Sequence, residues 1–334
     1  MTMAKQERFY INVFNGCNLS CSHCFNDGGF AEEAILTTPE ILCLVDEAVD
    51  ILKITEIQLT GGEPLQRSDI FPLIKELQDR GLAVILQTNG FFGQEPAKKI
   101  SQLAREGLSL IVSIDGIETN DLFRGKGVTS KALENVKTLS NETEIRINTL
   151  LSSSIRWKEI EELAELGEKF SIVLAFNPVC PLGRADFSLM MEPHKYFRWM
   201  YRLEGLRNRG IQVRKCFDLI GGRLMERENC PVRKGATIHI AADGKAYPCG
   251  FLVNRPECLI GSYRGESLQN LMGKIPAGCR LLHPDCQICD YHLREECWGG
   301  CPARILGLNG RFGEKDLYCM ASCLPSKGDL EDEP

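Results

Sequence analysis

From residue 8 to about residue 180, short β-rich runs alternate with stretches of helical periodicity. Six of these runs are almost continuously apolar and β-branched, which is typical of strands buried on both faces of a parallel sheet. They span residues 9–14, 56–60, 83–88, 109–114, 145–149 and 171–176. Strand–helix alternation predicts parallel strands joined by right-handed crossovers. Six units are too few for a closed eight-stranded barrel, so the sequence predicts an α/β fold built as an open, partial (β/α)6 TIM-like barrel.

The stretches between these runs carry apolar residues at helical spacing and predict the outer helices of the barrel. Thr38 is expected to cap the first helix, with Pro39 at its first position. Gly81, Gly107 and Gly167 stand where helices are expected to end, because glycine readily takes the left-handed conformation there. The remaining helices are expected at residues 69–80, 96–106, 130–139 and 157–167.

Three cysteines follow the first predicted strand within eight residues of one another. Cys17, Cys21 and Cys24 are spaced CxxxCxxC, and a short loop after a strand can turn three thiolates toward one point. Iron–sulfur clusters are held by cysteine thiolates and normally take four, so three thiolates leave one iron able to bind a small molecule. Tetrahedral zinc is the main alternative, but it needs two pairs, or a pair plus histidines, at longer separation. His23 is too close to Cys24 to reach the same tetrahedron easily.

Loops at the carboxyl ends of the strands carry the chemistry of parallel barrels, and polar residues follow every predicted strand here. Turn chemistry explains any one of them, but not their convergence on one rim. The glycines at 61 and 62 allow a ligand to approach the backbone, and the Glu63 carboxylate can accept hydrogen bonds from an ammonium group. The rim residues are Cys17, Cys21, Cys24, Gly61, Gly62, Glu63, Pro64, Asn89, Ser113, Asp115, Asn148 and Asn177.

Sixteen cysteines are unusual in a chain whose first eight residues are polar and lack the apolar core of a secretory signal. A reducing cytosol disfavours structural disulfides, so such clusters indicate metal sites. Eleven of the cysteines lie between residues 216 and 323, which predicts a second metal-binding region. The net charge is −6 without a basic run, and no apolar run reaches membrane-spanning length. We therefore expect a cytoplasmic protein with no nucleic-acid or membrane partner.

The CxxxCxxC loop, the Gly-Gly-Glu-Pro sequence and the Ser-Ile-Asp-Gly sequence that begins at Ser113 resemble the motifs of the radical S-adenosylmethionine (SAM) enzymes. The resemblance implies the same partial barrel, with a [4Fe–4S] cluster on Cys17, Cys21 and Cys24. SAM would be chelated to the open iron by its amino and carboxylate groups. One electron from the cluster would then cleave SAM to methionine and a 5′-deoxyadenosyl radical.

The same resemblance implies how the rim binds SAM. The Gly-Gly-Glu-Pro loop would hold the amino group, and Ser113 and Arg124 would bind the carboxylate, since a guanidinium matches a planar anion. Asp115 is either a turn residue or a contact to the ribose or the substrate, and Asn148 is a weaker candidate of the same kind. The residues implied are Gly61, Gly62, Glu63, Pro64, Ser113, Asp115, Arg124 and Asn148. Residues 181–185, Pro-Leu-Gly-Arg-Ala, are loop-like, and this PxGRA pattern recurs in several groups of radical SAM maturases.

In the C-terminal third, the order CxnGx4C, CxxC, CxxxC, C resembles the SPASM domain, which carries two auxiliary [4Fe–4S] clusters. A β-hairpin that turns at Asp243-Gly244 is expected within it. The family usually has five residues between the CxxC pair and the next cysteine, whereas seven intervene here. The resemblance implies that Cys230, Cys249 and Cys301 bind the first auxiliary cluster and that Cys286, Cys289, Cys297 and Cys319 bind the second.

Several points about this region stay open on the sequence. The fourth ligand of the first auxiliary cluster is Cys216, Cys258 or Cys279, or else that iron is left free for substrate. Cys323 could replace Cys319, and a zinc ribbon built from two CxxC-like pairs is the competing interpretation. The expected domains are a radical SAM core at 1–185, a helical connector at 186–225, a SPASM domain at 226–325 and a disordered acidic tail at 326–334.

These resemblances imply an enzyme that removes a hydrogen atom from its substrate and passes an electron through the auxiliary clusters. Flavodoxin or ferredoxin would be the electron donor. Many SPASM proteins mature ribosomal peptides or proteins, which we expect here. Because only about eight residues precede the first predicted strand, such a substrate would need a separate recognition protein. Small-molecule biosynthesis (on a tetrapyrrole, sugar or nucleoside) and a non-enzymatic iron–sulfur carrier or sensor are the alternatives. The candidate proton acceptors are Asp115, His194, Asp218 and His283.

Overall fold

The computed structural model describes residues 8–27, 35–215, 217–220, 223–226, 230–234, 237–272 and 274–323. Cys216, the side chain of Asp218 and the tail at 326–334 lie outside the described part of the chain.

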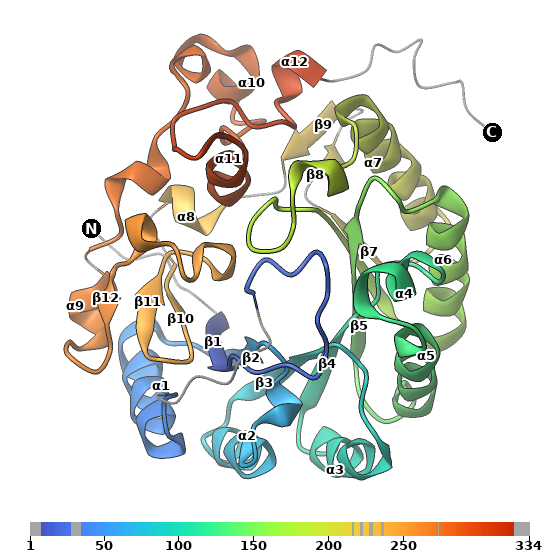
Figure 1. Cartoon of the computed structure of the whole chain (residues 1–334), viewed down its shortest axis with the longest axis vertical. Helices are drawn as coiled ribbons and strands as arrows, with labels where there is room; N and C mark the ends of the chain where they lie inside the picture. Colours follow the sequence, from blue (N-terminus) through green and yellow to red (C-terminus); the bar gives the residue numbers. More distant parts are fainter. Residues whose placement is uncertain are drawn as a thin grey trace.

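Seven parallel strands form the sheet predicted from the alternating pattern, curved into an open partial barrel (Figure 1). All six predicted strands are present, and a seventh, β7, extends the series. With only three residues, β7 is shorter than the runs that identify strands in a sequence. The strands are β1 (Arg8–Phe14), β2 (Glu56–Gly61), β3 (Ala83–Thr88), β4 (Leu108–Ser113), β5 (Ile145–Leu151), β6 (Val173–Pro178) and β7 (Val213–Lys215).

The cysteine-rich C-terminal third adds three short strands to the β1 edge of this sheet, which has ten strands in all. These are β10 (His239–Ile240), β11 (Lys245–Tyr247) and β12 (Gly261–Ser262). β10 runs parallel to β1, and β11 returns antiparallel to it. The hairpin predicted at Asp243-Gly244 is confirmed, with Gly244 at φ +87°. It covers a sheet edge whose backbone groups would otherwise be unpaired.

Helices pack against the outer face of the barrel and follow the strands in turn (Figure 1). They are α1 (Thr38–Leu52), α2 (Ile70–Asp79), α3 (Gln94–Ala104), α4 (Thr119–Arg124), α5 (Val128–Leu139), α6 (Trp157–Phe170) and α7 (Pro193–Asn208). The rest of the chain adds β8 (Phe217–Ile220), β9 (Arg223–Glu226), α8 (Pro231–Lys234), α9 (Leu268–Met272), α10 (Asp290–Leu293), α11 (Pro302–Asn309) and α12 (Met320–Cys323). Within the described residues, no helix has the length and apolarity needed to span a membrane.

Two predicted helix ends differ from the structure. Thr37, not Thr38, caps α1, because the Thr37 side chain accepts from the Glu40 amide while the Glu40 carboxylate accepts from the Thr37 amide. Gly167 does not end its helix. α6 continues past it and ends at Ser171, which takes the left-handed conformation at φ 54°.

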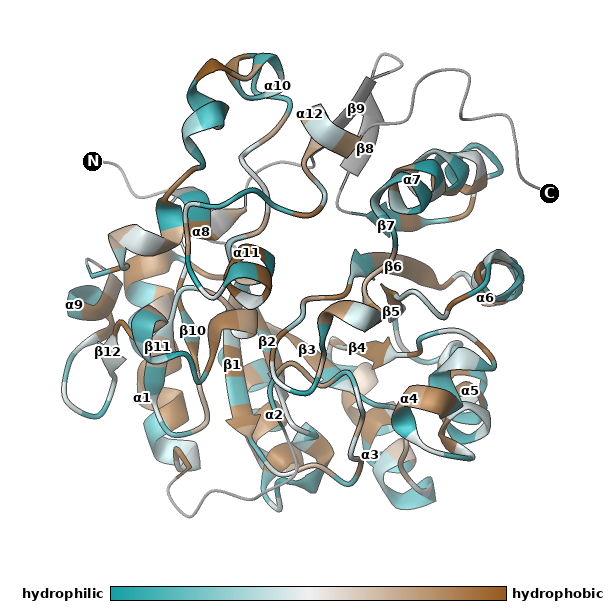
Figure 2. Ribbon diagram, turned by 45° about the horizontal axis from the view of Figure 1, so that its top comes forward, coloured by the Kyte–Doolittle hydropathy of each residue, from teal (hydrophilic) through white to brown (hydrophobic). Residues whose placement is uncertain are grey.

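The main core lies between the sheet and the outer helices. On β1, Phe9, Ile11 and Val13 are buried in this core, and the alternate residues Tyr10 and Asn12 face the inside of the barrel. In Figure 2, β4 and β6 are mostly brown and β1 is partly brown, whereas α5, α6 and α7 show much teal. Packing of this kind fixes the strand ends, and with them the rim loops, in a defined arrangement.

Candidate active site

The three cysteines of the N-terminal motif lie on the loop that follows β1, which we call the cysteine loop (residues 15–24). Their thiols interact electrostatically, since Cys21 is influenced by both Cys17 and Cys24. Burial raises the pKa of the Cys21 thiol, and the Arg124 guanidinium opposes that rise. The structure thus brings the three predicted thiols together beside a positive charge, which offsets part of the effect of burial on the thiolate form.

Gly61 and Gly62 let the loop after β2 pack directly on the cysteine loop. A Cβ on Gly61 would lie 2.0 Å from the Phe14 carbonyl oxygen, and one on Gly62 would lie 2.3 Å from that of Gly16. Instead, the Gly62 amide donates to the Phe14 carbonyl at 2.7 Å, and the Glu63 amide donates to the Gly16 carbonyl at 2.9 Å. These glycines therefore bring two backbones together, a role that the sequence interpretation, centred on ligand approach, did not include.

Glu63 is buried and ties the loop after β3 to this pair of loops. Its carboxylate accepts hydrogen bonds from the Thr88 hydroxyl at 2.9 Å and the Asn89 amide at 2.8 Å. Burial nevertheless raises the pKa of Glu63 to about 7. The Asn89 side-chain amide lies 3.8 Å from the Cys17 sulfur, and the buried Pro64 opens a short 3-10 turn (Pro64–Gln66). Three rim loops are thereby connected into one unit.

Asp115 is fully buried and links the loop after β4 to the cysteine loop. Its Oδ2 atom lies 2.7 Å from the Arg124 guanidinium and 3.0 Å from His23 Nε2, and its Oδ1 atom accepts from the Leu150 amide at 2.9 Å. Burial disfavours the charged form, but Arg124 and His23 hold the pKa of Asp115 well below its usual range. Both oxygens are engaged within the protein, so Asp115 orients its neighbours rather than offering a free carboxylate. His23 correspondingly turns its Nε2 atom to Asp115.

Arg124 lies at the end of α4 and is buried against the cysteine loop. Burial disfavours its charge, but the nearby Asp115 and Cys21 groups raise its pKa. The same segment is fastened to the loop by the Ser22 amide, which donates to the Phe123 carbonyl at 3.0 Å. A solvated surface arginine would have none of these features. Arg124 instead presents a fixed positive charge next to the three thiols.

Ser113 and Asn148 lie opposite one another on β4 and β5. The neighbours of Ser113, Val112 and Ile114, belong to the core behind the sheet. Because side chains alternate along a strand and opposed residues share a face, Ser113 and Asn148 both face the inside of the barrel. Both are half-buried near the carboxyl ends of their strands, where the sequence predicts the SAM carboxylate site.

Residues 181–185, which we call the strap, clamp the cysteine loop from the other side. The Arg184 amide donates to the Cys24 carbonyl at 2.9 Å, and its Nε atom donates to the Cys21 carbonyl at 2.8 Å. Gly183 has φ +63°, and a Cβ there would lie 2.4 Å from the Cys24 carbonyl oxygen. The sequence marks the strap as a loop with a recurrent pattern, but nothing local in it indicates this contact.

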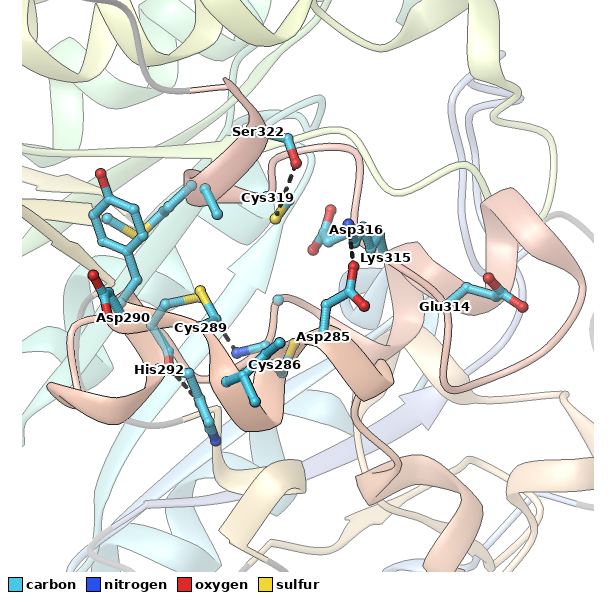
Figure 3. Close-up of a pocket in the computed structure, with 17 residues that line it drawn as sticks. Asp285, Cys286, Cys289, Asp290, His292, Glu314, Lys315, Asp316, Cys319 and Ser322 are labelled. Atoms are coloured by element: carbon cyan, nitrogen blue, oxygen red, sulfur yellow. Dashed lines mark hydrogen bonds and ion pairs between the residues drawn. The ribbon is translucent and has the colours of Figure 1, made fainter.

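The four cysteines predicted for the second auxiliary cluster line one cavity of about 490 Å³ (Figure 3). They are Cys286, Cys289, Cys297 and Cys319. Lys315 and Asp285, 2.7 Å apart, also line this cavity. Cys323 is not one of the lining residues, and its sulfur lies 3.3 Å from the Leu317 carbonyl oxygen. The geometry therefore brings Cys319, rather than Cys323, to the other three thiols.

The three cysteines predicted for the first auxiliary cluster also lie together. Cys230 and Cys249 both interact electrostatically with Cys301. Burial raises the pKa of Cys230 to about 11 and that of Cys249 to about 12. The Arg233 guanidinium donates to the Gly299 carbonyl at 2.8 Å, which steadies the turn that leads into Cys301.

The size of these thiol groups bears on which cofactor they fit. Within the described part of the chain, no group of three or more His, Cys, Asp or Glu side chains is arranged to hold a metal ion. A single zinc ion draws thiolates to about 2.3 Å, whereas a cubane of four irons and four sulfides keeps its thiolates farther apart. Four thiols around a cavity of about 490 Å³ fit the larger group.

Comparison with known proteins identifies the family. The model of the radical SAM superfamily matches residues 11–167. The AdoMet-dependent heme synthase of Methanosarcina barkeri is 30% identical over 342 residues, which cover 91% of this chain and 93% of the relative. The chain belongs to the radical SAM superfamily. Two other relatives match over about half of this chain. They are the mycofactocin maturase MftC of Mycolicibacterium smegmatis (29% identical, 50% of this chain and 43% of the relative) and a GTP 3′,8-cyclase of Clostridium perfringens (31% identical, 52% and 55%).

Solved structures support the fold over almost the whole chain. Streptococcus suis SuiB bound to its precursor peptide SuiA superposes with a TM-score of 0.75 at 15% identity, over 93% of this chain and 76% of that one. The AdoMet-bound anSMEcpe gives a TM-score of 0.74 at 17% identity, over 97% and 95%. At these identities the likeness concerns the fold alone, and it confirms the partial barrel of the radical SAM enzymes.

Proposed function

We propose that this chain is a radical SAM enzyme that binds SAM at the N-terminal motif and uses two SPASM-type auxiliary clusters for electron transfer. The main support is that the three motif thiols, the Gly-Gly-Glu-Pro loop and Arg124 are held together at one rim by buried hydrogen bonds. The bound cofactors supply the chemistry: one electron splits SAM to methionine and a 5′-deoxyadenosyl radical, which removes a substrate hydrogen atom.

In this proposal the residues of the rim have distinct roles. Cys17, Cys21 and Cys24 hold the cluster and leave one iron for SAM. Glu63 and the backbone of its loop would accept N–H hydrogen bonds from the SAM amino group, which would draw the buried Glu63 carboxyl toward its ionised form. Arg124 receives the SAM carboxylate, and Ser113 and Asn148 line the barrel beside it. Asp115 is a positioning residue, because it fixes Arg124 on one side and His23 on the other.

The auxiliary sites complete the proposal. The four thiols around the C-terminal cavity would hold a cluster with no open iron, suited to passing electrons rather than to binding substrate. The electron source would be a flavodoxin or ferredoxin in the cytosol. A carrier or sensor without SAM chemistry is disfavoured, because such a protein would not need a SAM-binding rim.

We further propose that the substrate carries carboxylate groups, because arginines gather inside the barrel. Arg146 on β5 and Arg214 on β7 face the same side of the sheet, since their partners on β6, Val173 and Ala175, are two residues apart. Burial, and then the charges of Arg214 and Arg8, lower the pKa of Arg146 to about 10, and Glu56, the ion-pair partner of Arg8, offsets only part of this shift. Its Nε atom is buried without a hydrogen-bond partner among the described residues. An anion bound here would relieve both the repulsion and the missing hydrogen bond.

A tetrapyrrole with carboxylate side chains is the first candidate for that substrate. The heme synthase relative is matched over 93% of its length. A second Methanosarcina barkeri relative, Fe-coproporphyrin III synthase, is 37% identical over 136 residues, 39% of this chain and 33% of its own length. A ribosomal peptide with a separate recognition protein is the second candidate, and the maturase among the relatives favours it.

The enzyme class is tested by anaerobic reconstitution followed by SAM and dithionite. We expect 5′-deoxyadenosine, and about twelve irons per chain from three cubanes. Cys21→Ala should abolish SAM cleavage and leave about eight irons in place. An intact N-terminal cluster that yields no 5′-deoxyadenosine would refute the enzyme assignment. A wild-type iron content near four would refute the auxiliary clusters alone.

The substrate class is tested by binding coproporphyrin III, followed through its fluorescence. Arg146→Ala should raise the dissociation constant about 10- to 150-fold, because a hydrogen bond to a charged group is worth about 1.5–3 kcal/mol. Arg105→Ala, at an exposed site at the end of α3, is the matched control and should leave binding unchanged. Equal binding by both variants would refute the proposal that Arg146 binds a substrate carboxylate. Failure of the wild type to bind would favour the peptide candidate.

A further inference from the structure

A fourth cysteine lies among the three predicted for the first auxiliary cluster. Cys180 follows β6 and is only 6% exposed. Its thiol is hydrogen-bonded to the Cys301 sulfur, and it also interacts electrostatically with Cys249. Since Cys230 and Cys249 in turn interact with Cys301, the four sulfurs form one group. Cys180 is far from the others in sequence and belongs to none of the predicted motifs.

The backbone explains why Cys180 and Cys301 meet. Cys301 is the N-cap residue of α11, and Gly307 lies within that helix. A Cβ on Gly307 would lie 2.4 Å from the Pro181 carbonyl oxygen, so the helix and the residue after Cys180 are in direct backbone contact. Leu182 is buried in the same apolar cluster as Cys180. The close approach therefore fixes the start of the strap against the helix that begins at Cys301.

Charge around Cys301 suits a metal-bound thiolate. The Arg304 guanidinium lies near the Cys301 thiol. Arg304 is held in place by a buried pair with Asp316 at 2.6 Å. Asp316 also accepts from the Cys301 amide at 2.7 Å. The same Arg304–Asp316 pair thus fixes both the backbone of Cys301 and a positive charge near its thiol.

Two of the other cysteines considered for the missing ligand, Cys258 and Cys279, lie next to one another. The sulfurs of Cys258 and Cys279 lie 4.0 Å from one another. The leading influence on the pKa of each is their mutual hydrogen bond, which raises the pKa of Cys258 and lowers that of Cys279. These two thiols are therefore partners of one another, whereas the Cys180 thiol is the partner of the predicted ligand Cys301.

We propose that Cys180 is the fourth protein ligand of the first auxiliary cluster, with Cys230, Cys249 and Cys301. The proposal rests on the proposed function, which supplies the cluster. A set of four thiolates leaves no iron of this cluster for substrate, so it serves as an electron relay and the substrate binds elsewhere. The strap supports a relay, because only three residues lie between Cys180 and Arg184, whose amide is hydrogen-bonded to the Cys24 carbonyl of the proposed SAM site.

The test uses the full-length chain with Cys17, Cys21 and Cys24 all changed to alanine, so that only auxiliary iron remains. In this parent we expect about eight irons per chain from two cubanes. Adding Cys180→Ala should either lower the iron to about four or leave a cluster with an open iron. The second result is seen when added imidazole shifts the EPR spectrum of the dithionite-reduced protein. Cys258→Ala, which also removes one buried thiol, is the matched control and should behave as the parent does.

Cys180→Ser guards against a simple folding defect, because it keeps the size of the side chain. A changed EPR spectrum in Cys180→Ser, with a thermal midpoint equal to that of Cys258→Ala, supports ligation. The proposal is overturned if Cys180→Ala matches the parent in iron content and in EPR spectrum with and without imidazole, or if Cys258→Ala changes both in the same way. A parent without auxiliary iron would instead show that the auxiliary clusters themselves are absent, a separate result that overturns both proposals.

Discussion

Replacing Gly183 with alanine should damage the SAM site far more than a matched glycine substitution elsewhere. Gly310, which ends α11, is the control: it has φ +66°, against +63° for Gly183, and no atom lies within 4 Å of a Cβ added there. Both substitutions place a side chain in the left-handed region, which costs about 1–2 kcal/mol. Only the strap substitution also creates a collision.

The structure gives the overlap between a Cβ at position 183 and the carbonyl groups that it would meet. The new Cβ would lie 2.4 Å from the Cys24 carbonyl oxygen and 2.6 Å from that of Phe25, whereas real contacts of this kind stay above 3.0 Å. One side must therefore move by at least 0.6 Å, the gap between 2.4 and 3.0 Å. Overpacking of this sort costs about 1–3 kcal/mol, which brings the total to about 2–5 kcal/mol. Because the displaced backbone belongs to a predicted ligand, a shift near 1 Å is expected to reduce SAM cleavage by up to about 100-fold.

Two measurements check this expectation. In urea unfolding of the cluster-free chains, Gly183→Ala should lower the free energy of unfolding by about 1–3 kcal/mol more than Gly310→Ala does. After anaerobic reconstitution, 5′-deoxyadenosine formation should fall at least tenfold in Gly183→Ala and by less than about twofold in Gly310→Ala. If both variants lose the same stability and both keep wild-type cleavage, the strap does not position the cysteine loop and the reasoning is refuted.

Three further predictions follow from the buried groups. Asp115→Asn removes the charge facing buried Arg124 and should cost about 3–5 kcal/mol in unfolding free energy. Because burial raises the pKa of Glu63 to about 7, the folded state favours its neutral form, and its ionisation weakens folding as pH rises from about 4.5 to 7. SAM affinity should rise about tenfold between pH 6 and pH 8 by equilibrium binding, and Glu63→Gln should remove that rise; a pH-independent affinity in the wild type would contradict the assignment. Cys319→Ala should lower the iron content by about four per chain, and Cys323→Ala should leave it unchanged. The opposite result would make Cys323, not Cys319, the cluster ligand.

The barrel could be predicted because its information is local. Each strand is a short apolar run and each outer helix has its own stripe of apolar residues. The spacing of the apolar residues therefore identifies both kinds of element. The clearest error, at Gly167, also has a local origin. Glycine is common at helix ends, but α6 continues for three residues beyond Gly167, to Phe170. Its C-cap is Ser171, a residue type that rarely takes the left-handed conformation.

The candidate site was predictable only where its residues form a compact motif. The three motif cysteines, Glu63 and Arg124 lie within short patterns near strand ends, and the structure brings them together. Cys180 and Arg146 carry no such signal: one is an isolated cysteine, and the other is a single charge in a strand. Their meaning depends on partners more than sixty residues away, Cys301 and Arg214, and no pattern within either segment identifies those partners.

The strap explains how the proposed SAM site and the proposed first auxiliary site, which are far apart in sequence, are held at a fixed distance. Gly183 of the strap packs directly against the Cys24 carbonyl of the cysteine loop. On the other side, Gly307 of α11 packs directly against the Pro181 carbonyl of the strap. Both contacts are between backbones, and a side chain on either glycine would collide with the facing carbonyl. Backbone groups cannot change rotamer, so neither contact can be accommodated by a small side-chain movement. The distance between the proposed SAM site and the proposed first auxiliary site is therefore set by main-chain packing, which would give the proposed electron path a rigid connection.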